Sequence, residues 1–411
     1  MERECISMYL KNVSVFNGHD EEILPAQNIL IEEGRFAKIG QIVPSSQNVH
    51  TLDMTGKFLM PGLIDAHFHA YASDLDFAKL DQLPQTYHAL KGSELLSGAL
   101  RRGFTTVRDV GGADYGLWRG MEDGLFAGPR LFYAGKALSQ TGGHGDMRAP
   151  SLEPCACGSS GMLTRVVDGV DNIRAVAREE LRRGASHIKV FVSGGISSPS
   201  DPIWSLQYSD PELEAVVDEA HRRGAYVVAH AYTPEAIARS VKAGIRSIEH
   251  ANLITPEVAS EVQAAGAFVV PTLVTYDSLG RYGHQNGAPD TMIAKLDEVA
   301  SKGLEAIRIC REAGVKLGFG TDLLGELHKF QRQEILLRSK VETPFQILNS
   351  ATAVNAELMG LEGEIGSIKE GAFADFLLLD ADPLQNIESL ADGTAMVDVY
   401  KGGTSLGQNT D

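Results

Sequence analysis

The chain has 411 residues, of which 43% are hydrophobic and 22% charged, and its formal net charge is −17. This composition is ordinary for a globular protein with a large core. The acidic balance argues against nucleic acid or an anionic membrane as the main partner. No run of about 20 apolar residues occurs, which predicts no membrane-spanning helix. The N-terminal segment MERECISMYL does not have the pattern of a secretory signal. Four cysteines in a chain of this length do not suggest a disulfide framework. We therefore expect a cytoplasmic protein with reduced thiols.

Short segments of alternating apolar and polar residues, separated by turns, occur near both ends of the chain. Examples are YLKNVSVFNG, NILIEEGRFAKIG and ADFLLLDADP. A period of two is typical of strands with one face buried. We therefore expect one small β-sandwich domain built from residues 1–58 and 364–411, next to a catalytic domain of residues 59–363.

A different plan recurs within residues 59–363. A helix-like stretch ends in glycine, a short apolar strand follows, and a polar residue closes the unit, as in HRRGAYVVAH, which ends at His230. Each glycine suits the left-handed position after a helix, and such strands suit a sheet buried on both faces. These glycines are Gly103, Gly184, Gly224, Gly244, Gly266 and Gly314. Because no Gly-rich dinucleotide turn occurs, this α/β pattern predicts a (β/α)8 TIM barrel, with its active site at the carboxyl ends of the strands.

Candidate metal ligands follow these strands. MPGLIDAHFHA supplies His67 and His69, which point to the same side of a strand because they are two residues apart. Lys189 stands inside the apolar strand HIKVFV, where an unpaired ammonium would be costly. Imidazole and carboxylate are common ligands of Zn²⁺ and related ions. The residues expected at one mouth of the barrel are His67, His69, Lys189, His230, His250 and Asp322.

The segments PGLIDAHFH, HIKVFVSGG, VVAHAY, SIEHAN and GFGTD resemble, in type and order, the amidohydrolase superfamily in its subtype with two metal ions. The resemblance extends over nearly the whole chain. It implies that CO₂ converts Lys189 into a carbamate, an anion that bridges two divalent cations. Zn²⁺ is the expected metal, and Mn²⁺ or Co²⁺ would also suit nitrogen and oxygen ligands. The resemblance assigns one ion to His67, His69, Lys189 and Asp322, and the other to Lys189, His230 and His250.

The same resemblance implies a reaction. A hydroxide that bridges the metals attacks an amide carbonyl, and Asp322 passes the proton to the leaving nitrogen. His144 in TGGHGD and Tyr232 in HAYTP are the expected catalytic and substrate-binding donors to the substrate oxygen. Backbone N–H groups of the loop SGGISSP are candidates for binding the substrate carboxylate, and Glu326 is a candidate for contacting a free amino group.

A narrower resemblance concerns the substrate. GKALSQTGGHGD, SGGISSPSDP, VPTLVTYD and GFGTDLLGE resemble a branch of Xaa-Pro dipeptidases (prolidases), Xaa-Arg/Lys dipeptidases and ochratoxin-type amidases. TGGHGD and HAYTP are most similar to the Xaa-Pro group. We therefore expect hydrolysis of L-Xaa-L-Pro dipeptides or other N-acyl amino acids. The resemblance also implies a small-molecule substrate and a homo-oligomer.

Four alternatives stay open at this point. The chain could be an Xaa-Arg/Lys dipeptidase, an ochratoxin-type amidase, or a hydrolase of cyclic amides similar to imidazolonepropionase. It could also be an inactive relative that serves as an assembly module, although retention of all six ligands argues against this.

Other residues are expected to have no catalytic role. Cys155 and Cys157 are interpreted as thiols of a long loop over residues 145–165 rather than as a second zinc site. Arg108 and Asp109 close a predicted strand, where we expect a structural ion pair or a supporting contact.

Overall fold

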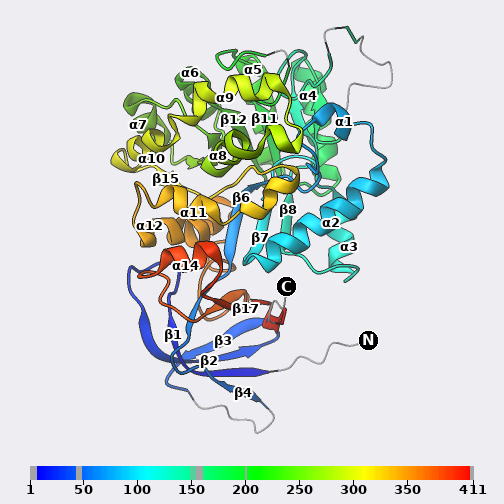
Figure 1. The fold of residues 1–411 in the computed structure, drawn as a ribbon. Helices are drawn as coiled ribbons and strands as arrows, with labels where there is room; N and C mark the ends of the chain where they lie inside the picture. The colour runs from blue at the N-terminus through cyan, green and yellow to red at the C-terminus, as the bar shows by residue number, and fades with distance from the viewer. Residues whose placement is uncertain (1–6, 43–48, 150, 153–160, 200, 408–411) are drawn as a thin grey trace. The chain divides into compact units, whose positions relative to one another are not determined.

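The computed structural model describes residues 7–42, 49–149, 151–152, 161–199 and 201–407 (Figure 1). Cys155 and Cys157 lie outside these ranges, so the expected loop thiols stay a prediction. Within the same ranges, no helix is both long enough and apolar enough to cross a membrane.

The described chain divides into two compact units. The first unit contains residues 1–65, 98–106 and 335–411, and the second contains residues 66–97 and 107–334. The domain boundaries expected from the sequence stay a prediction. The predicted metal ligands all belong to the second unit, so each unit can be described by itself.

Strands from both ends of the chain share one sheet in the first unit (Figure 1). Within the described residues this sheet has eight strands, in the order β18-β17-β16-β5-β1-β2-β3, with β4 paired to β1. The strands are β1 Met8–Val15, β2 Leu24–Glu32, β3 Arg35–Gly40, β4 His50–Asp53, β5 Phe58–Pro61, β16 Phe376–Leu379, β17 Met396–Lys401 and β18 Thr404–Ser405. Antiparallel pairing of β5 with β16 joins the two ends of the chain. Alternate residues such as Leu10, Ile29 and Phe376 face a common apolar core.

Parallel strands alternate with helices in the rest of the chain, as the sequence predicts. The strands are β6 Leu63–Phe68, β7 Phe104–Asp109, β8 Arg130–Tyr133, β9 Ala137–Ser139, β10 Thr164–Val166, β11 His187–Phe191, β12 Tyr226–Ala231, β13 Ser247–His250, β14 Phe268–Val270 and β15 Lys316–Leu317. Their ladders form two sheets in the described chain, β10-β9-β11-β12-β13-β14-β15 and β6-β7-β8.

These ladders do not close into one sheet, in contrast to the continuous barrel expected. One gap lies between β8 and β9, where Gly135 has φ +71° and interrupts the strand. The other follows β15, which ends after two residues. Backbone hydrogen bonds cross both gaps. Examples are the bonds from Ser186 N to Tyr133 O at 2.9 Å and from Ala66 N to Phe319 O at 2.8 Å. The strand ends therefore still meet around one site.

The helices are α1 Phe77–Leu80, α2 Gln85–Arg101, α3 Tyr115–Glu122, α4 Val170–Arg182, α5 Asp210–Arg222, α6 Pro234–Lys242, α7 Pro256–Ala264, α8 Leu273–Tyr282, α9 Asp290–Ala300, α10 Gly303–Glu312, α11 Gln333–Arg338, α12 Pro344–Asn349, α13 Asn355–Leu358 and α14 Ile387–Asp392. Short helical turns lie at His284–Asn286, Gly325–Phe330 and Ser350–Val354.

Local sequence explains where these helices begin and end. Thr233 and Thr255 cap α6 and α7, each followed by proline at the first helical position. One face of α4, which includes Ile173 and Leu181, is buried. All six glycines predicted to follow helices have positive φ, between +66° and +98°. The helix–glycine–strand plan is thus confirmed.

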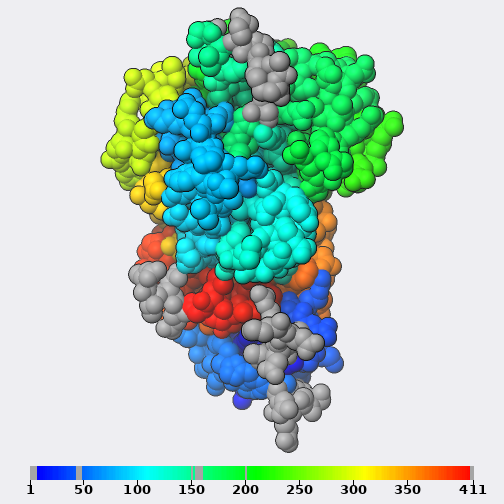
Figure 2. All heavy atoms as spheres, turned by 90° about the vertical axis from the view of Figure 1, so that its right-hand side faces the viewer, coloured from blue at the N-terminus to red at the C-terminus, as the bar shows by residue number. Residues whose placement is uncertain are grey.

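Figure 2 shows one face of the molecule, with the light-blue to cyan segments of α2 and α3 at the surface. Leu90 in α2 is 71% exposed and Tyr115 in α3 is 53% exposed. Isolated apolar side chains are common on protein surfaces, and the expected homo-oligomer stays a prediction.

Candidate active site

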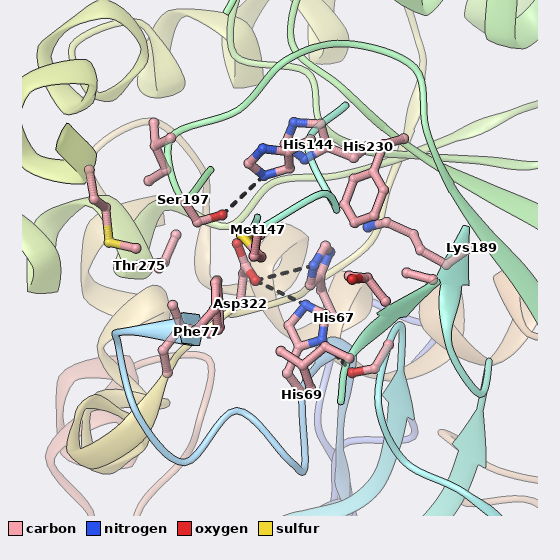
Figure 3. Close-up of a pocket in the computed structure, with 18 of the residues that line it drawn as sticks. His67, His69, Phe77, His144, Met147, Lys189, Ser197, His230, Thr275 and Asp322 are labelled. Carbon is pink, nitrogen blue, oxygen red and sulfur yellow. Dashed lines mark hydrogen bonds and ion pairs between the residues drawn. The ribbon is translucent and has the colours of Figure 1, made fainter. Parts of the chain in front are cut away.

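The side chains expected to bind metal converge in one pocket of the second unit (Figure 3). His67 lies in β6, and Lys189, His230 and His250 lie in the neighbouring parallel strands β11, β12 and β13. Parallel strands present their carboxyl ends at the same edge, which explains the convergence of residues distant in sequence. The lining includes His67, His69, Lys189, His230, His250 and Asp322.

The Asp322 carboxylate lies against both histidines of the first motif. Its Oδ1 is 3.3 Å from His67 Nε2 and 3.3 Å from His69 Nε2. Ligand atoms of His67, His250 and Asp322 all lie within 4.8 Å of one another. The ring centroids of His230 and His250 are 4.6 Å apart. Imidazole nitrogens and a carboxylate oxygen gathered in this way form a donor set that fits Zn²⁺.

Each candidate histidine uses one ring nitrogen for a protein partner. His69 Nδ1 lies 2.8 Å from Gly111 O, and His230 Nε2 lies 3.1 Å from Gly194 O. A carbonyl oxygen only accepts, so these two nitrogens carry the protons. His250 Nδ1 lies 2.8 Å from Thr272 Oγ1. The second nitrogen of each ring is therefore available as a ligand atom.

The electrostatic environment favours the protonation states that metal ligands need at several of these residues. His69 is an exception, because burial would lower its pKa but the hydrogen bond and charge of Asp322 raise it. Burial lowers the pKa of His230 and of His250 well below the usual value, so both imidazoles are neutral. Burial would raise the pKa of Asp322, but the neighbouring His67 and His69 hold it well below its usual range. Burial lowers the pKa of the Lys189 amine to about 8. Neutral imidazole and ionised carboxylate are the forms that bind metal.

Two of the candidate ligands have left-handed backbone conformations. His250 has φ +74°, the following Ala251 has φ +55°, and Asp322 has φ +52°. Such conformations are uncommon outside glycine, and they tend to cluster at functional sites where the surrounding structure maintains them. His250 is the last residue of β13, whereas Asp322 lies in the segment that follows β15, and both side chains line the pocket.

His144 and Tyr232, the predicted donors, lie beside His230. The His144 ring stacks on the His230 ring with centroids 4.5 Å apart, and Ser197 Oγ lies 3.1 Å from His144 Nε2. The Tyr232 hydroxyl accepts a hydrogen bond of 3.0 Å from Tyr276. Burial raises the pKa of Tyr232, so its hydroxyl stays protonated. Tyr232 can therefore donate its own proton to a ligand in the pocket.

Comparison with known proteins identifies the family. A sequence model of the amidohydrolase family matches residues 58–406. The chain belongs to the amidohydrolase family. Ochratoxinase of Aspergillus niger is 33% identical to this amidohydrolase over 377 residues, which cover 87% of the chain and 77% of ochratoxinase.

Two solved structures place the amidohydrolase within a branch. A prolidase complexed with N-methylphosphonate-L-proline is 43% identical with a TM-score of 0.95, and the match covers 98% of this chain and 100% of that one. A Xaa-Pro dipeptidase with methionine in its active site is 27% identical with a TM-score of 0.86, with coverage of 98% and 100%. The predicted superfamily and branch are confirmed, and the chain is a hydrolase with a mixed α/β amidohydrolase fold.

The rest of the amidohydrolase pocket is mostly apolar. Among its described lining residues, the only carboxylates are Asp81 and Asp322, and no arginine occurs. Asp81 Oδ1 already accepts the Met162 N–H at 2.7 Å. The apolar lining is formed by Phe77, Leu80, Met147, Leu163, Phe191, Ile196, Leu279, Met292 and Leu324.

A buried polar network behind His144 was not expected from the sequence. Asp201 Oδ2 lies 3.5 Å from His144 Nδ1 and accepts from Gln207 Nε2 at 2.9 Å. Lys295 in α9 donates to the backbone oxygens of Gly195, Ser198 and Asp201. The lysine therefore holds in place the described parts of the loop that carries Ser197. No short motif announces these contacts, because the partners lie up to 100 residues apart.

The loop N–H groups and Glu326, which were candidates for substrate contacts, lie in different environments. The N–H groups of Gly194 and Gly195 donate to Ser205 O and Asp201 Oδ2, so these two N–H groups are already used. Glu326 is exposed and is not among the described residues of the pocket, and its role stays a prediction.

Arg108 does not pair with its neighbour Asp109. Its Nη2 donates to Glu249 Oε1 at 2.8 Å. Asp109 instead accepts backbone N–H groups of Ala70, Gly111 and Ala113. The supporting contact was therefore the correct interpretation, because Asp109 orders the chain that follows His69.

Proposed function

We propose that this amidohydrolase is a metal-dependent dipeptidase that cleaves the amide bond of L-Xaa-L-Pro or similar N-acyl amino acids. One observation carries the proposal: the predicted ligands and the two predicted donors converge in one largely apolar pocket. In this proposal the strands of the catalytic domain form the (β/α)8 barrel, and the strands of both termini form the β-sandwich. We also propose that the protein forms a homo-oligomer and is located in the cytoplasm.

The proposed metal centre uses residues of this pocket alone. His67, His69, Lys189 and Asp322 would hold one divalent ion, and Lys189 with His230 and His250 would hold the second. Two bound cations, Zn²⁺ or alternatively Mn²⁺ or Co²⁺, supply Lewis acidity and lower the pKa of a water.

Lys189 is the proposed bridging ligand after modification. Its neutral amine would add to CO₂, forming a nitrogen–carbon bond and releasing one proton, to give an anionic carbamate. The side chain is only 2% exposed, so a protonated amine is costly there. Burial lowers the pKa of the amine to about 8, which increases the neutral fraction at physiological pH. A carbamate compensated by two cations would remove the cost.

The protein side chains have separate proposed tasks. Asp322 takes a proton from the attacking water and delivers it to the amide nitrogen as the carbon–nitrogen bond breaks. Tyr232 donates a hydrogen bond to the carbonyl oxygen, where negative charge develops. His144, held at Nδ1 by Asp201, is the second proposed donor to the substrate, through the Nε2 atom that lies against Ser197 Oγ.

The pocket lining favours an uncharged substrate side chain. A leaving arginine or lysine would need a carboxylate, and outside the proposed metal centre the described lining offers only Asp81. The mostly apolar lining therefore favours proline over arginine or lysine as the leaving amino acid. The prolidase relative supports proline as the leaving group. An aromatic amide is the second candidate, because ochratoxinase is 33% identical and the lining is apolar.

The test is a library of dipeptides and N-acyl amino acids offered to the zinc-loaded protein. We expect release of proline from L-Xaa-L-Pro with apolar Xaa. Release of arginine or lysine without proline would contradict the proposal in favour of the sister dipeptidases. Hydrolysis of ochratoxin-type amides without any dipeptide would favour the amidase.

A further inference from the structure

Glu249, which lies in the segment SIEHAN but was given no role by the sequence, is a fully buried carboxylate beside His67. Its Oε2 accepts from His67 Nδ1 at 2.7 Å. Its Oε1 accepts from Arg108 Nη2 at 2.8 Å and from Ser247 Oγ at 2.5 Å. Arg108 Nε in turn donates to Ala66 O at 2.6 Å. Both carboxylate oxygens are therefore fixed by partners from β6, β7 and β13.

The end of β13 brings two consecutive side chains to the same imidazole. In a regular strand, consecutive side chains point to opposite faces. Here the chain leaves the strand at His250 with φ +74°. The His250 ring centroid lies 4.9 Å from that of His67, while Glu249 holds the Nδ1 side of the same ring. The strained turn thus allows both the candidate ligand His250 and the supporting carboxylate of Glu249 to reach the His67 ring.

The partner of His67 differs in charge from the partners of the other candidate histidines. His69 and His230 use the backbone oxygens of Gly111 and Gly194, and His250 uses the Thr272 hydroxyl. Charge-assisted hydrogen bonds are about twice as strong as neutral ones. A carboxylate behind a histidine also makes its other nitrogen a better metal ligand.

We propose that Glu249 is a positioning residue that keeps the His67 proton on Nδ1 and its lone pair on Nε2, and thereby strengthens metal binding at that nitrogen. Arg108 holds Glu249 in place. The inference rests on the proposed metal-dependent function. Nε2 is the His67 nitrogen that lies 3.3 Å from Asp322 Oδ1, so the orientation directs the lone pair to the predicted metal centre.

The buried pair of Arg108 and Glu249 could instead contribute to stability alone. A second buried arginine–glutamate pair in the chain provides a control for that possibility. Arg338 Nε lies 2.5 Å from Glu342 Oε2, and both side chains are fully buried. This pair belongs to the first unit and lines no part of the described pocket. Removing it should disturb folding without changing the metal ligands.

The test compares two double variants. Glu249→Gln alone would leave the buried Arg108 charge uncompensated and could unfold the protein, so it is combined with Arg108→Met. The control combines Glu342→Gln with Arg338→Met. Zinc affinity is measured on metal-stripped protein by competition with a chromogenic zinc chelator. The thermal midpoint of the metal-free protein is recorded for each variant.

We expect zinc binding about 10- to 100-fold weaker in the Glu249 variant and unchanged in the control. Zinc binding as tight as in the parent, or an equal loss in both variants, would overturn the role of Glu249. A parent protein that binds no zinc would contradict the proposed metal centre itself, and the role of Glu249 with it. The two failures are therefore distinguishable.

Discussion

Tyr232 illustrates how a neighbouring residue can prepare a side chain for its proposed catalytic role. Tyr276 donates its hydroxyl proton to Tyr232 at 3.0 Å, so the acceptor capacity of Tyr232 is used within the protein. Burial raises the pKa of Tyr232 and keeps it protonated. Its own proton is then available to a developing oxyanion.

We predict that Tyr232→Phe lowers kcat by about 10²- to 10³-fold, the usual loss for one oxyanion donor. Steady-state kinetics on an L-Xaa-L-Pro substrate would measure it. Tyr276→Phe is the matched control, because it retains the Tyr232 hydroxyl, and it should cause a smaller loss. A larger loss for Tyr276→Phe than for Tyr232→Phe would contradict the assignment.

Glu180 in α4 should make stability depend on pH. It is 4% exposed, and burial raises its pKa above the usual value. The folded state therefore binds this proton more tightly than the unfolded state. The resulting stability is fully present below the unfolded pKa and is lost as pH rises through the folded pKa.

We predict that Glu180→Gln raises the thermal midpoint relative to the parent more at pH 7.5 than at pH 4. The adjacent Glu179 is the control, because hydrogen bonds with Arg182 and Arg183 lower its pKa to about 2. Glu179→Gln should lower the thermal midpoint at pH 7.5, because the substitution removes an ionised carboxylate that the two arginines stabilise. The change should be small, because these exposed contacts are screened by solvent. Parallel pH profiles for parent and Glu180→Gln would refute the prediction.

Single residues differed in how well the sequence predicted them. The predicted ligands belong to short motifs at or near strand ends, and the order of these motifs was sufficient to predict that the side chains line one pocket. Glu249 and His67 are 182 residues apart, and a buried glutamate looks like any other acidic residue in a sequence. Asp201 and Lys295 were missed for the same reason, because their roles depend on which strands and loops become neighbours.

Among the elements, the segment after β15 is shaped by a close approach to β6. A Cβ atom added to Gly320 would lie 2.6 Å from His67 Cβ and 2.6 Å from Val270 Cγ1. Contacts this short force the neighbours to move. The glycine therefore lets the chain pass His67 on its way to Asp322.

We predict that Gly320→Ala lowers stability by about 1–3 kcal/mol through overpacking and weakens zinc retention by displacing His67. Denaturation and zinc analysis after dialysis would measure the two effects. Gly280→Ala in α8 is the control, because a Cβ atom added to Gly280 would lie 3.5 Å from its nearest neighbour, Leu296 Cδ2. That variant should gain about 0.5–1 kcal/mol, because alanine favours helix, and a comparable loss in both variants would contradict the argument.

The helix–glycine–strand plan was predictable because each unit depends on local backbone preferences, and the six glycines with positive φ bear this out. The interruptions of the strand ladder were not predictable. Gly135 and the two-residue β15 break hydrogen-bond ladders, and such breaks depend on neighbours that sequence periodicity does not reveal.

At the scale of the whole molecule, the sequence predicted that both ends of the chain build one small β-sandwich domain. The structure pairs β5 with β16 and so joins the two ends in one sheet, while the sandwich stays a prediction. Substrate preference was harder to predict. The apolar lining comes from separate segments, such as Phe77 in α1, Leu163 before β10 and Met292 in α9. An apolar residue in a sequence does not reveal whether it packs in the core or lines a cavity.

The central claim concerns the fate of Lys189, since the bridging carbamate connects every other part of the proposed centre. The most direct measurement is a high-resolution crystal structure of protein prepared with zinc and bicarbonate. We expect electron density for a carboxyl group on the Lys189 amine, with two zinc ions bound to it and to the neighbouring histidines and Asp322. An unmodified amine with no pair of ions, in folded protein prepared with zinc and bicarbonate, would contradict the account.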